Sequence, residues 1–178
     1  MKDEILKEIK NMSGSLLGIG IDDEDMLDYI EKNNNIDLCY ILSNVKKSKT
    51  NKKFKLFKKG KGKTVNIKKL KKYFHKKSLD NILCDYNIIK KFNRSFISNS
   101  VYINKGKLYI YGNIEELDKL KEKYERYTDD ITINKNNKSF IIIINNKNAK
   151  TNIFKDNFYK IKDLLSDSLD SLTEFLTN

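Results

Sequence analysis

The sequence contains no proline and no tryptophan, only two cysteines, a single alanine and no long apolar run. Two cysteines in 178 residues exclude a fold that depends on a framework of disulfides. The longest purely apolar run, residues 140–144, is far shorter than the roughly 20 residues of a membrane-spanning helix. The first ten residues mix both charges without an apolar stretch, so we expect no secretory signal. These absences favour a single cytoplasmic domain, residues 1–178, with its own core.

Basic side chains are abundant and concentrated in one part of the chain. Lysine and arginine supply 36 residues against 24 acidic ones, a formal net charge of +12. No acidic residue lies between Asp37 and Asp80, whereas residues 46–77 hold 16 lysines and His75. Such a division indicates one basic surface rather than a generally basic protein.

The lysine-rich segment has two interpretations. Its lysines could neutralise the phosphates of RNA or DNA, and the aromatic residues between them could stack on bases. Four lysines would follow the third strand on the edge of the sheet where ligands bind, and we expect them to contact nucleic acid: Lys58, Lys59, Lys61 and Lys63. Alternatively, the lysines form a solvated face in a lysine-biased composition, and the aromatic residues turn into the core.

Hydrophobic periodicity predicts alternating strands and helices along most of the chain. Buried strands are predicted at 15–20, 36–42, 81–84 and 107–111, with a weaker one near 54–57. Apolar residues three and four positions apart predict the helices between them, and Asp22 is a candidate N-cap. The predicted helices cover residues 2–11, a stretch after Asp22, 66–76, 87–102 and a stretch after Asn113.

The pattern changes near the end of the sequence. Residues 130–134 and 140–145 form two predicted strands around a polar turn, which indicates an antiparallel hairpin. Residues 156–177 carry six apolar residues at helical spacing, so we expect an amphipathic helix that packs on the sheet or on the first helix; self-association is the alternative. Together these elements predict an α/β fold with three layers and a mostly parallel seven-stranded sheet, with the hairpin joined to its edge.

This order of elements, together with the segment SLLGIGIDDEDMLDYI, resembles the Rossmann-like class I S-adenosylmethionine-dependent methyltransferases over residues 15–145. Gly18 and Gly20 match the first two glycines of the family's loop after the first strand, and Asp22 occupies the third glycine position. The segment DNILCDY resembles the family's fourth strand, whose end faces the substrate. The helices at 2–11 and 156–177 are additions to that core.

The resemblance implies binding of S-adenosylmethionine and methyl transfer to a nucleic acid or another anionic substrate. Gly18 and Gly20 would let the cofactor approach the backbone, and Asp22 would hold its amino group. Asp80, Asp85 and Tyr86 would line the acceptor side. The acidic residues after the loop disfavour a pyrophosphate but are compatible with a cationic cofactor.

A second function is consistent with the same segment. Leu16 stands where the family usually has an acid, and Ser43 and Asn44 stand where the ribose-binding acid is expected. These departures favour a non-catalytic binding or partner module with the same fold. Asp85 could simply cap the next helix.

We expect no metal site, because His75 is the only histidine and lies among lysines.

Overall fold

The computed structural model describes residues 2–42, 54–56, 67–147, 149, 161 and 165. The first part of the chain forms α1 (Lys2–Asn11), β1 (Gly14–Ile19), α2 (Glu24–Lys32), β2 (Ile36–Leu42) and β3 (Phe54–Leu56). The middle part forms η1 (Ile67–Lys72), β4 (Leu79–Asp85), α3 (Tyr86–Ile89), η2 (Lys90–Phe92) and α4 (Asn93–Ile103). The last part forms β5 (Asn104–Asn113), η3 (Ile114–Glu116), α5 (Leu117–Glu125), β6 (Ile131–Lys135) and β7 (Ser139–Asn145).

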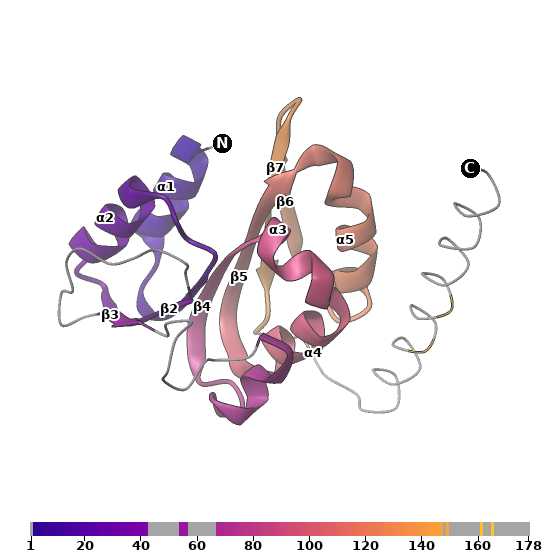
Figure 1. The fold of residues 1–178 in the computed structure, drawn as a ribbon, viewed down its shortest axis with the longest axis horizontal. Helices are drawn as coiled ribbons and strands as arrows, with labels where there is room; N and C mark the ends of the chain where they lie inside the picture. Colours follow the sequence, from indigo (N-terminus) through magenta and orange to yellow (C-terminus); the bar gives the residue numbers. More distant parts are fainter. Residues whose placement is uncertain are drawn as a thin grey trace.

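The strands form one sheet in the order β3-β2-β1-β4-β5-β7-β6. Strands β3, β2, β1, β4 and β5 run parallel to one another, and β7 is antiparallel to both β5 and β6. Helices cover both faces: α1 and α2 lie on one, and α3, α4 and α5 lie on the other (Figure 1). The α/β architecture and its mostly parallel sheet are therefore confirmed.

Side chains alternate between two cores, one on each face of the sheet. In β1, Leu16 belongs to the core beneath α1 and α2, whereas Leu17 and Ile19 belong to the core beneath the other helices. The same alternation continues in β4, where Ile82 and Leu83 face opposite sides. Strands buried on both faces need continuous apolar runs, which explains why the central strands lack a polar face.

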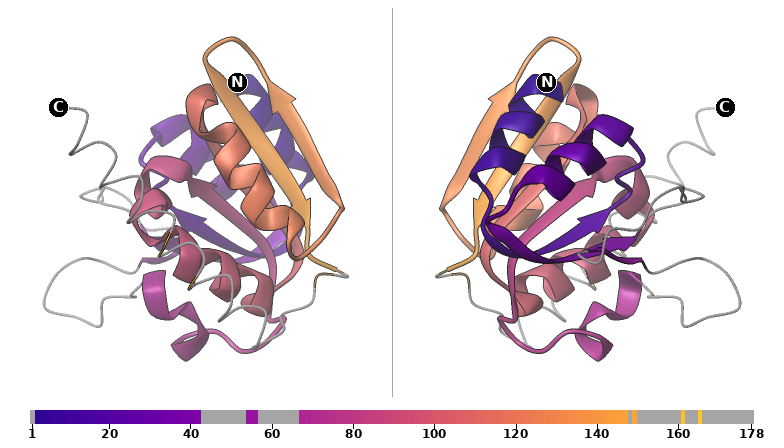
Figure 2. Two further views of the ribbon diagram at one scale, coloured as in Figure 1. Left: turned by 90° about the vertical axis from the view of Figure 1, so that its right-hand side faces the viewer. Right: turned by 90° about the vertical axis from the view of Figure 1, so that its left-hand side faces the viewer.

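The hairpin formed by β6 and β7 is confirmed at the edge of the sheet. Asn136 closes its turn, because its side-chain Oδ1 accepts bonds from the backbone nitrogens of Lys138 and Ser139. The isoleucine-rich β7 pairs on both sides, with β5 and with β6, so this β-prone run is not an open edge. Figure 2 shows the hairpin in orange, its turn projecting past α5.

Some predicted helices differ in detail. The helix expected at 66–76 is the 3₁₀ segment η1, interrupted by a non-helical Lys69. The helix expected at 87–102 is divided into α3, η2 and α4. The N-cap of α2 is Asp23, whose carboxylate accepts a bond from the nitrogen of Met26, and not Asp22. Neighbouring acids have equal capping propensity, so the sequence alone does not choose between them.

The C-terminal helix expected at 156–177 lies outside the described residues except for Ile161 and Leu165. Both residues are helical, and they are 58% and 63% exposed, so these two side chains are not packed on the sheet as expected. Both faces of the sheet are already covered by other helices. Within the described ranges, no helix combines the length and the apolarity needed to cross a membrane.

Candidate functional site

The glycine loop lies at the carboxyl end of β1, as expected. Gly20 has a φ of +70°, in the left-handed region where a side chain is strained. The loop then leads directly into α2, which begins at Glu24. The turn itself therefore requires glycine at position 20, whether or not a ligand approaches it.

On the side where a Cβ atom would project, both glycines pack against the chain's own side chains. A Cβ atom at Gly20 would lie only 2.5 Å from Cγ1 of Ile88, a residue of α3. A Cβ atom at Gly18 would lie 2.7 Å from Ile21 Cδ1 and 2.8 Å from Ile41 Cδ1. The two glycines thus allow β1, β2 and α3 to pack closely. The sequence resemblance gave these glycines a different role, the close approach of a cofactor.

The acidic residues after the loop take part in internal contacts. Lys2 of α1 places its Nζ 2.9 Å from an Asp23 oxygen and 2.6 Å from an Asp25 oxygen. The bond from Lys2 holds the pKa of Asp23 below its ordinary value, against a smaller opposing effect of burial. The negative charge at the start of α2 is therefore partly balanced by a cation from the protein itself.

Asp85 lies next to the loop, at the carboxyl end of β4. Its Oδ1 accepts a bond of 2.8 Å from the nitrogen of Asn87, so it caps α3, the alternative that the sequence left open. Partial burial raises the pKa of Asp85, the bond from Asn87 opposes this shift, and the nearby Asp22 adds to it. Asp22 and Asp85 are thus brought to the same edge.

Two tyrosines, Tyr111 and Tyr86, lie near this edge of the sheet. The hydroxyl of Tyr111, at the end of β5, lies 3.5 Å from the carbonyl oxygen of Gly20 and donates toward it. Burial raises the pKa of Tyr111 above its ordinary value. Tyr86 is only 4% exposed and its ring lies 6.4 Å from that of Phe140, centroid to centroid, so Tyr86 is chiefly a core residue. The sequence prediction included Tyr86 and missed Tyr111, although Tyr111 ends a predicted strand.

Asp80 does not belong to this edge, which corrects its expected place on the acceptor side. It is the second residue of β4, whereas Asp85 is the last. At about 3.3 Å per residue the two lie roughly 16 Å apart. Asp80 Oδ2 accepts bonds from the nitrogen and the hydroxyl of Ser15, at 3.0 and 2.8 Å, and its Oδ1 pairs with Lys105 at 3.0 Å.

The four lysines expected to contact nucleic acid, Lys58, Lys59, Lys61 and Lys63, lie outside the described residues, as do Ser43 and Asn44. The described parts of the lysine-rich segment are residues 54–56 and the stretch that begins at Ile67. Its lysines at 68, 69, 71, 72 and 76 are exposed. Within the described ranges, no three histidine, cysteine, aspartate or glutamate side chains gather into a candidate metal site.

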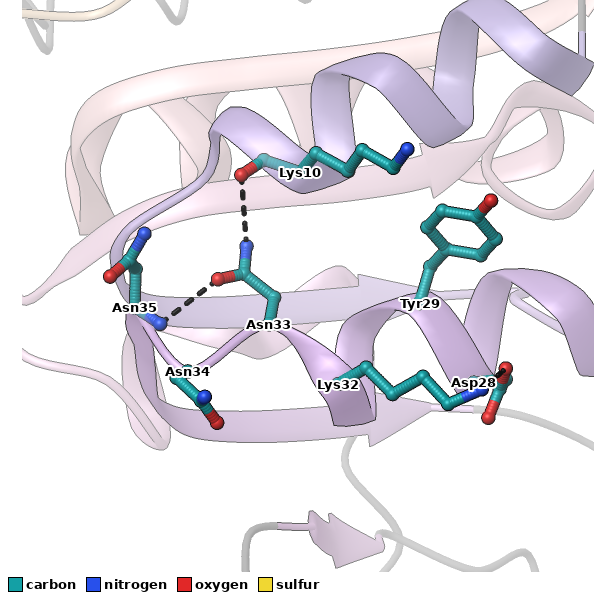
Figure 3. A pocket seen from close by; sticks show the side chains of 7 residues that line it. All are labelled: Lys10, Asp28, Tyr29, Lys32, Asn33, Asn34 and Asn35. Atoms are coloured by element: carbon teal, nitrogen blue, oxygen red, sulfur yellow. Dashed lines mark hydrogen bonds and ion pairs between the residues drawn. The ribbon is translucent and has the colours of Figure 1, made fainter.

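A surface pocket of about 790 Å³ lies at the opposite edge of the sheet, between the ends of α1 and α2 (Figure 3). Asn33, just after α2, connects the two helices there: its side-chain Nδ2 donates to the carbonyl oxygens of Ile9 and Met12 at 2.7 and 2.9 Å. Lys10 Nζ lies 5.1 Å from the ring centroid of Tyr29. None of the predicted site residues lines this pocket, whose lining residues are Lys10, Asp28, Tyr29, Lys32, Asn33, Asn34 and Asn35.

Comparison with solved structures supports the resemblance to class I S-adenosylmethionine-dependent methyltransferases. A Methanococcus maripaludis protein described as such a methyltransferase matches at a TM-score of 0.54 and 13% identity, over 84% of this chain and 85% of that one. Spermidine synthase from Thermotoga maritima matches at 0.56 and 10% identity, over 84% and 60% of the two chains. A Haloferax volcanii methyltransferase, solved with its activator, matches at 0.54 and 8% identity, over 77% and 86%.

At these identities the similarity shows the fold alone. This chain spans 51% of the length of a Bacillus subtilis protein that is also similar. No protein-family model matches the sequence. No curated protein matches it either.

The glycine loop lies where the sequence resemblance places the cofactor. On the side where a Cβ atom would project, Ile88 packs against Gly20, and Ile21 and Ile41 pack against Gly18. A ligand that approached Gly20 from that side would have to displace Ile88 from van der Waals contact with the loop.

Proposed function

We propose that this chain is a non-catalytic binding module with a methyltransferase-like fold. The observation that carries the proposal is the packing of Ile88 against Gly20 on the side where a Cβ atom would project, which closes that side of the glycine loop to a ligand. Ile88 is partly buried and packs against the core, so moving it away from the loop would lose favourable van der Waals contacts. In this interpretation the loop is a structural turn between β1 and α2.

The acids at the loop support the same proposal. Asp23 and Asp25 pair with Lys2, and Asp85 caps α3. Each carboxylate thus has a role within the fold that needs no ligand. The sequence departures at Leu16, Ser43 and Asn44 point in the same direction, since the usual acids are missing there.

Thermal unfolding with and without S-adenosylhomocysteine tests the proposal. A ligand at about 100 times its dissociation constant stabilises the native state by about 2.7 kcal/mol, which shifts the melting temperature measurably. We expect no shift for this chain at millimolar ligand. The similar Methanococcus maripaludis protein, measured in parallel, is the positive control. A saturable shift for this chain would contradict the proposal.

Methyl transfer is the second candidate function, and one observation favours it. Asp22 and the partly buried Asp85 lie at the same edge, and burial and Asp22 both raise the pKa of Asp85. Two neighbouring carboxylates would be stabilised by the cationic groups of S-adenosylmethionine. In that case Ile88 would swing away on binding, Gly18 and Gly20 would contact the cofactor, and the protein would align it with an acceptor.

The partner of the proposed module is a nucleic acid or another protein. The lysine-rich segment at 46–77, including Lys58, Lys59, Lys61 and Lys63, supports a nucleic-acid partner by its charge. The Haloferax volcanii neighbour, solved with an activator protein, supports the use of this fold in protein assemblies. Contact of those four lysines with RNA or DNA stays a prediction.

A further inference from the structure

We infer that Lys69, Lys72, Tyr73 and Lys76 form a binding surface for single-stranded nucleic acid, on which Tyr73 stacks an unpaired base. This surface lies around η1 and the turn that follows it, among the magenta segments of Figure 1. The inference rests on the proposed binding module and specifies its partner, but it does not depend on whether the glycine loop holds a cofactor.

The two neighbouring aromatic residues have different places in the fold. Phe74 is 7% exposed and belongs to the core, where its ring meets that of Tyr40 edge-on at 5.1 Å. Tyr73 is 41% exposed, one of the few large apolar side chains at the described surface. Phe74 is therefore a core residue, whereas Tyr73 keeps the other predicted role, stacking on a base at the surface.

The fold holds this surface in a defined shape. Leu70 anchors η1, because its side chain is fully buried. The backbone nitrogen of Tyr73 donates to the carbonyl oxygen of Leu70 at 2.9 Å. Asn99 of α4 accepts a bond from the nitrogen of Lys71 and donates to the carbonyl oxygen of Lys68, at 3.0 and 3.3 Å. A binding surface anchored this way loses little conformational entropy when a ligand binds.

The positive charge of this surface is not neutralised within the described part of the chain. Several lysines elsewhere form ion pairs, such as Lys32 with Asp28 and Lys105 with Asp80. Lys69, Lys72 and Lys76 form no ion pair in the described ranges, and all three are exposed. Exposed lysines this close in sequence favour a polyanion such as a nucleic acid, whose phosphates would release counterions on binding.

Tyr73 decides between single and double strands. A base can stack on a tyrosine ring only when its face is accessible, and in a duplex each face is covered by the neighbouring base pairs. Lysines alone would bind both forms through their phosphates. An exposed aromatic ring among exposed lysines therefore fits a single strand, whose bases and phosphates both face the protein.

The experiment measures binding of the full-length protein to labelled oligo-uridylate, to a duplex of equal length and to polyglutamate. Tyr73→Ala should weaken binding of the single strand about 5- to 100-fold, whereas Tyr73→Phe, which keeps the ring, should bind like the wild type. Neither change should alter binding of the duplex by more than about twofold, because phosphate contacts remain.

Charge variants complete the test. Changing Lys69, Lys72 and Lys76 together to Gln should lower the logarithmic salt dependence of single-strand binding by about 2, since each phosphate contact contributes ~0.7. The matched control changes three exposed lysines far along the sequence to Gln, which alters the net charge equally and should leave the slope unchanged: Lys7, Lys135 and Lys138.

The outcomes separate the possible partners. Preference for oligo-uridylate with loss in Tyr73→Ala supports the inference. Equal binding of polyglutamate and oligo-uridylate would overturn the inference and indicate an acidic protein as the partner. An equal decrease of the salt dependence in both triple lysine variants would also overturn it, because binding would then depend on net charge alone. Binding of the duplex as strongly as the single strand, unaffected by Tyr73→Ala, would also overturn it.

Discussion

At the scale of single residues, Asp80 joins three strands at their amino ends. Its carboxylate accepts two bonds from Ser15 at the start of β1 and pairs with Lys105 in β5. Its own nitrogen donates to the Ser15 hydroxyl at 3.0 Å. Gly14, with a φ of +75°, lets the chain pass close to the carboxylate. These contacts make Asp80 a structural residue.

Asp80→Ala should therefore destabilise the protein. Hydrogen bonds to a charged group contribute more than neutral ones, but the side chain is 35% exposed, so we expect a loss of only about 1–2 kcal/mol. Urea unfolding at neutral pH measures it. Asp28→Ala, which removes an exposed pair with Lys32, is the control and should cost less than about 0.5 kcal/mol. Equal losses in the two variants would contradict the role of Asp80.

The same residue gives a pH dependence. Burial raises the pKa of Asp80, but the bonds from Ser15 and the charge of Lys105 outweigh it, so the pKa lies below the ordinary value of 3.8. A carboxyl whose pKa is lowered by folding stabilises the native state above its unfolded pKa, and this contribution is lost as pH falls through the folded value. The difference between wild type and Asp80→Ala should thus shrink below about pH 4.

The residues at the loop were only partly predictable. Gly20 and the cap at Asp85 follow from local rules, because a left-handed turn needs glycine and a helix start needs an acceptor. The filling of the loop by Ile88 was not predictable, since it depends on where α3 lies relative to β1. Asp80 was misplaced because it was grouped with Asp85 by its sequence segment, although the strand predicted at 81–84 separates the two residues.

At the scale of elements, β7 joins the hairpin to the rest of the sheet. It lies between β5 and β6, and Ile142 pairs with Ile110 on one side and Ile133 on the other. Ile142 is fully buried in the core beneath α5, whereas Ile143 faces the other side of the sheet and is partly buried. The hairpin therefore contributes side chains to the core of the domain.

Ile142→Ala should cost about 2–5 kcal/mol, because it opens a cavity in a core that cannot collapse around it. Ile143→Ala, the adjacent position in the same strand, should cost about 1 kcal/mol, since its side chain is only partly buried. Chemical denaturation of both variants provides the measurement. Similar losses at the two positions would show that the two faces of β7 are packed alike.

The strands were more predictable than the helices. The strands predicted at 36–42, 107–111 and 140–145 all lie at observed strands, because an apolar run bounded by polar residues defines them. The break between α3 and α4 was not predicted, since Ile88, Ile89, Phe92 and Phe96 continue a helical spacing across it. Periodicity reports which residues face the core but not whether the backbone stays helical between them.

At the scale of the whole molecule, the helices that the structure describes on the two faces of the sheet all lie between residues 2 and 125. The α/β class and the mostly parallel sheet were predictable because alternating strands and helices imply right-handed crossovers, and the hairpin was predictable from the polar turn between the last two strands. The C-terminal segment was not placed by such a rule. An amphipathic helix needs a partner, but the sequence pattern does not identify which surface provides it.

The exposed positions of Ile161 and Leu165 indicate that these two side chains contribute little to the stability of the domain. Changing both residues to Ser should alter the free energy of unfolding by no more than about 0.5 kcal/mol. Truncation after Asn157 tests the rest of the predicted stripe. Because exposed apolar side chains promote association, both variants should be less self-associated than the full chain in sedimentation experiments. A loss of stability above about 1 kcal/mol in either variant would instead show that the stripe packs on its own domain, as the periodicity predicted.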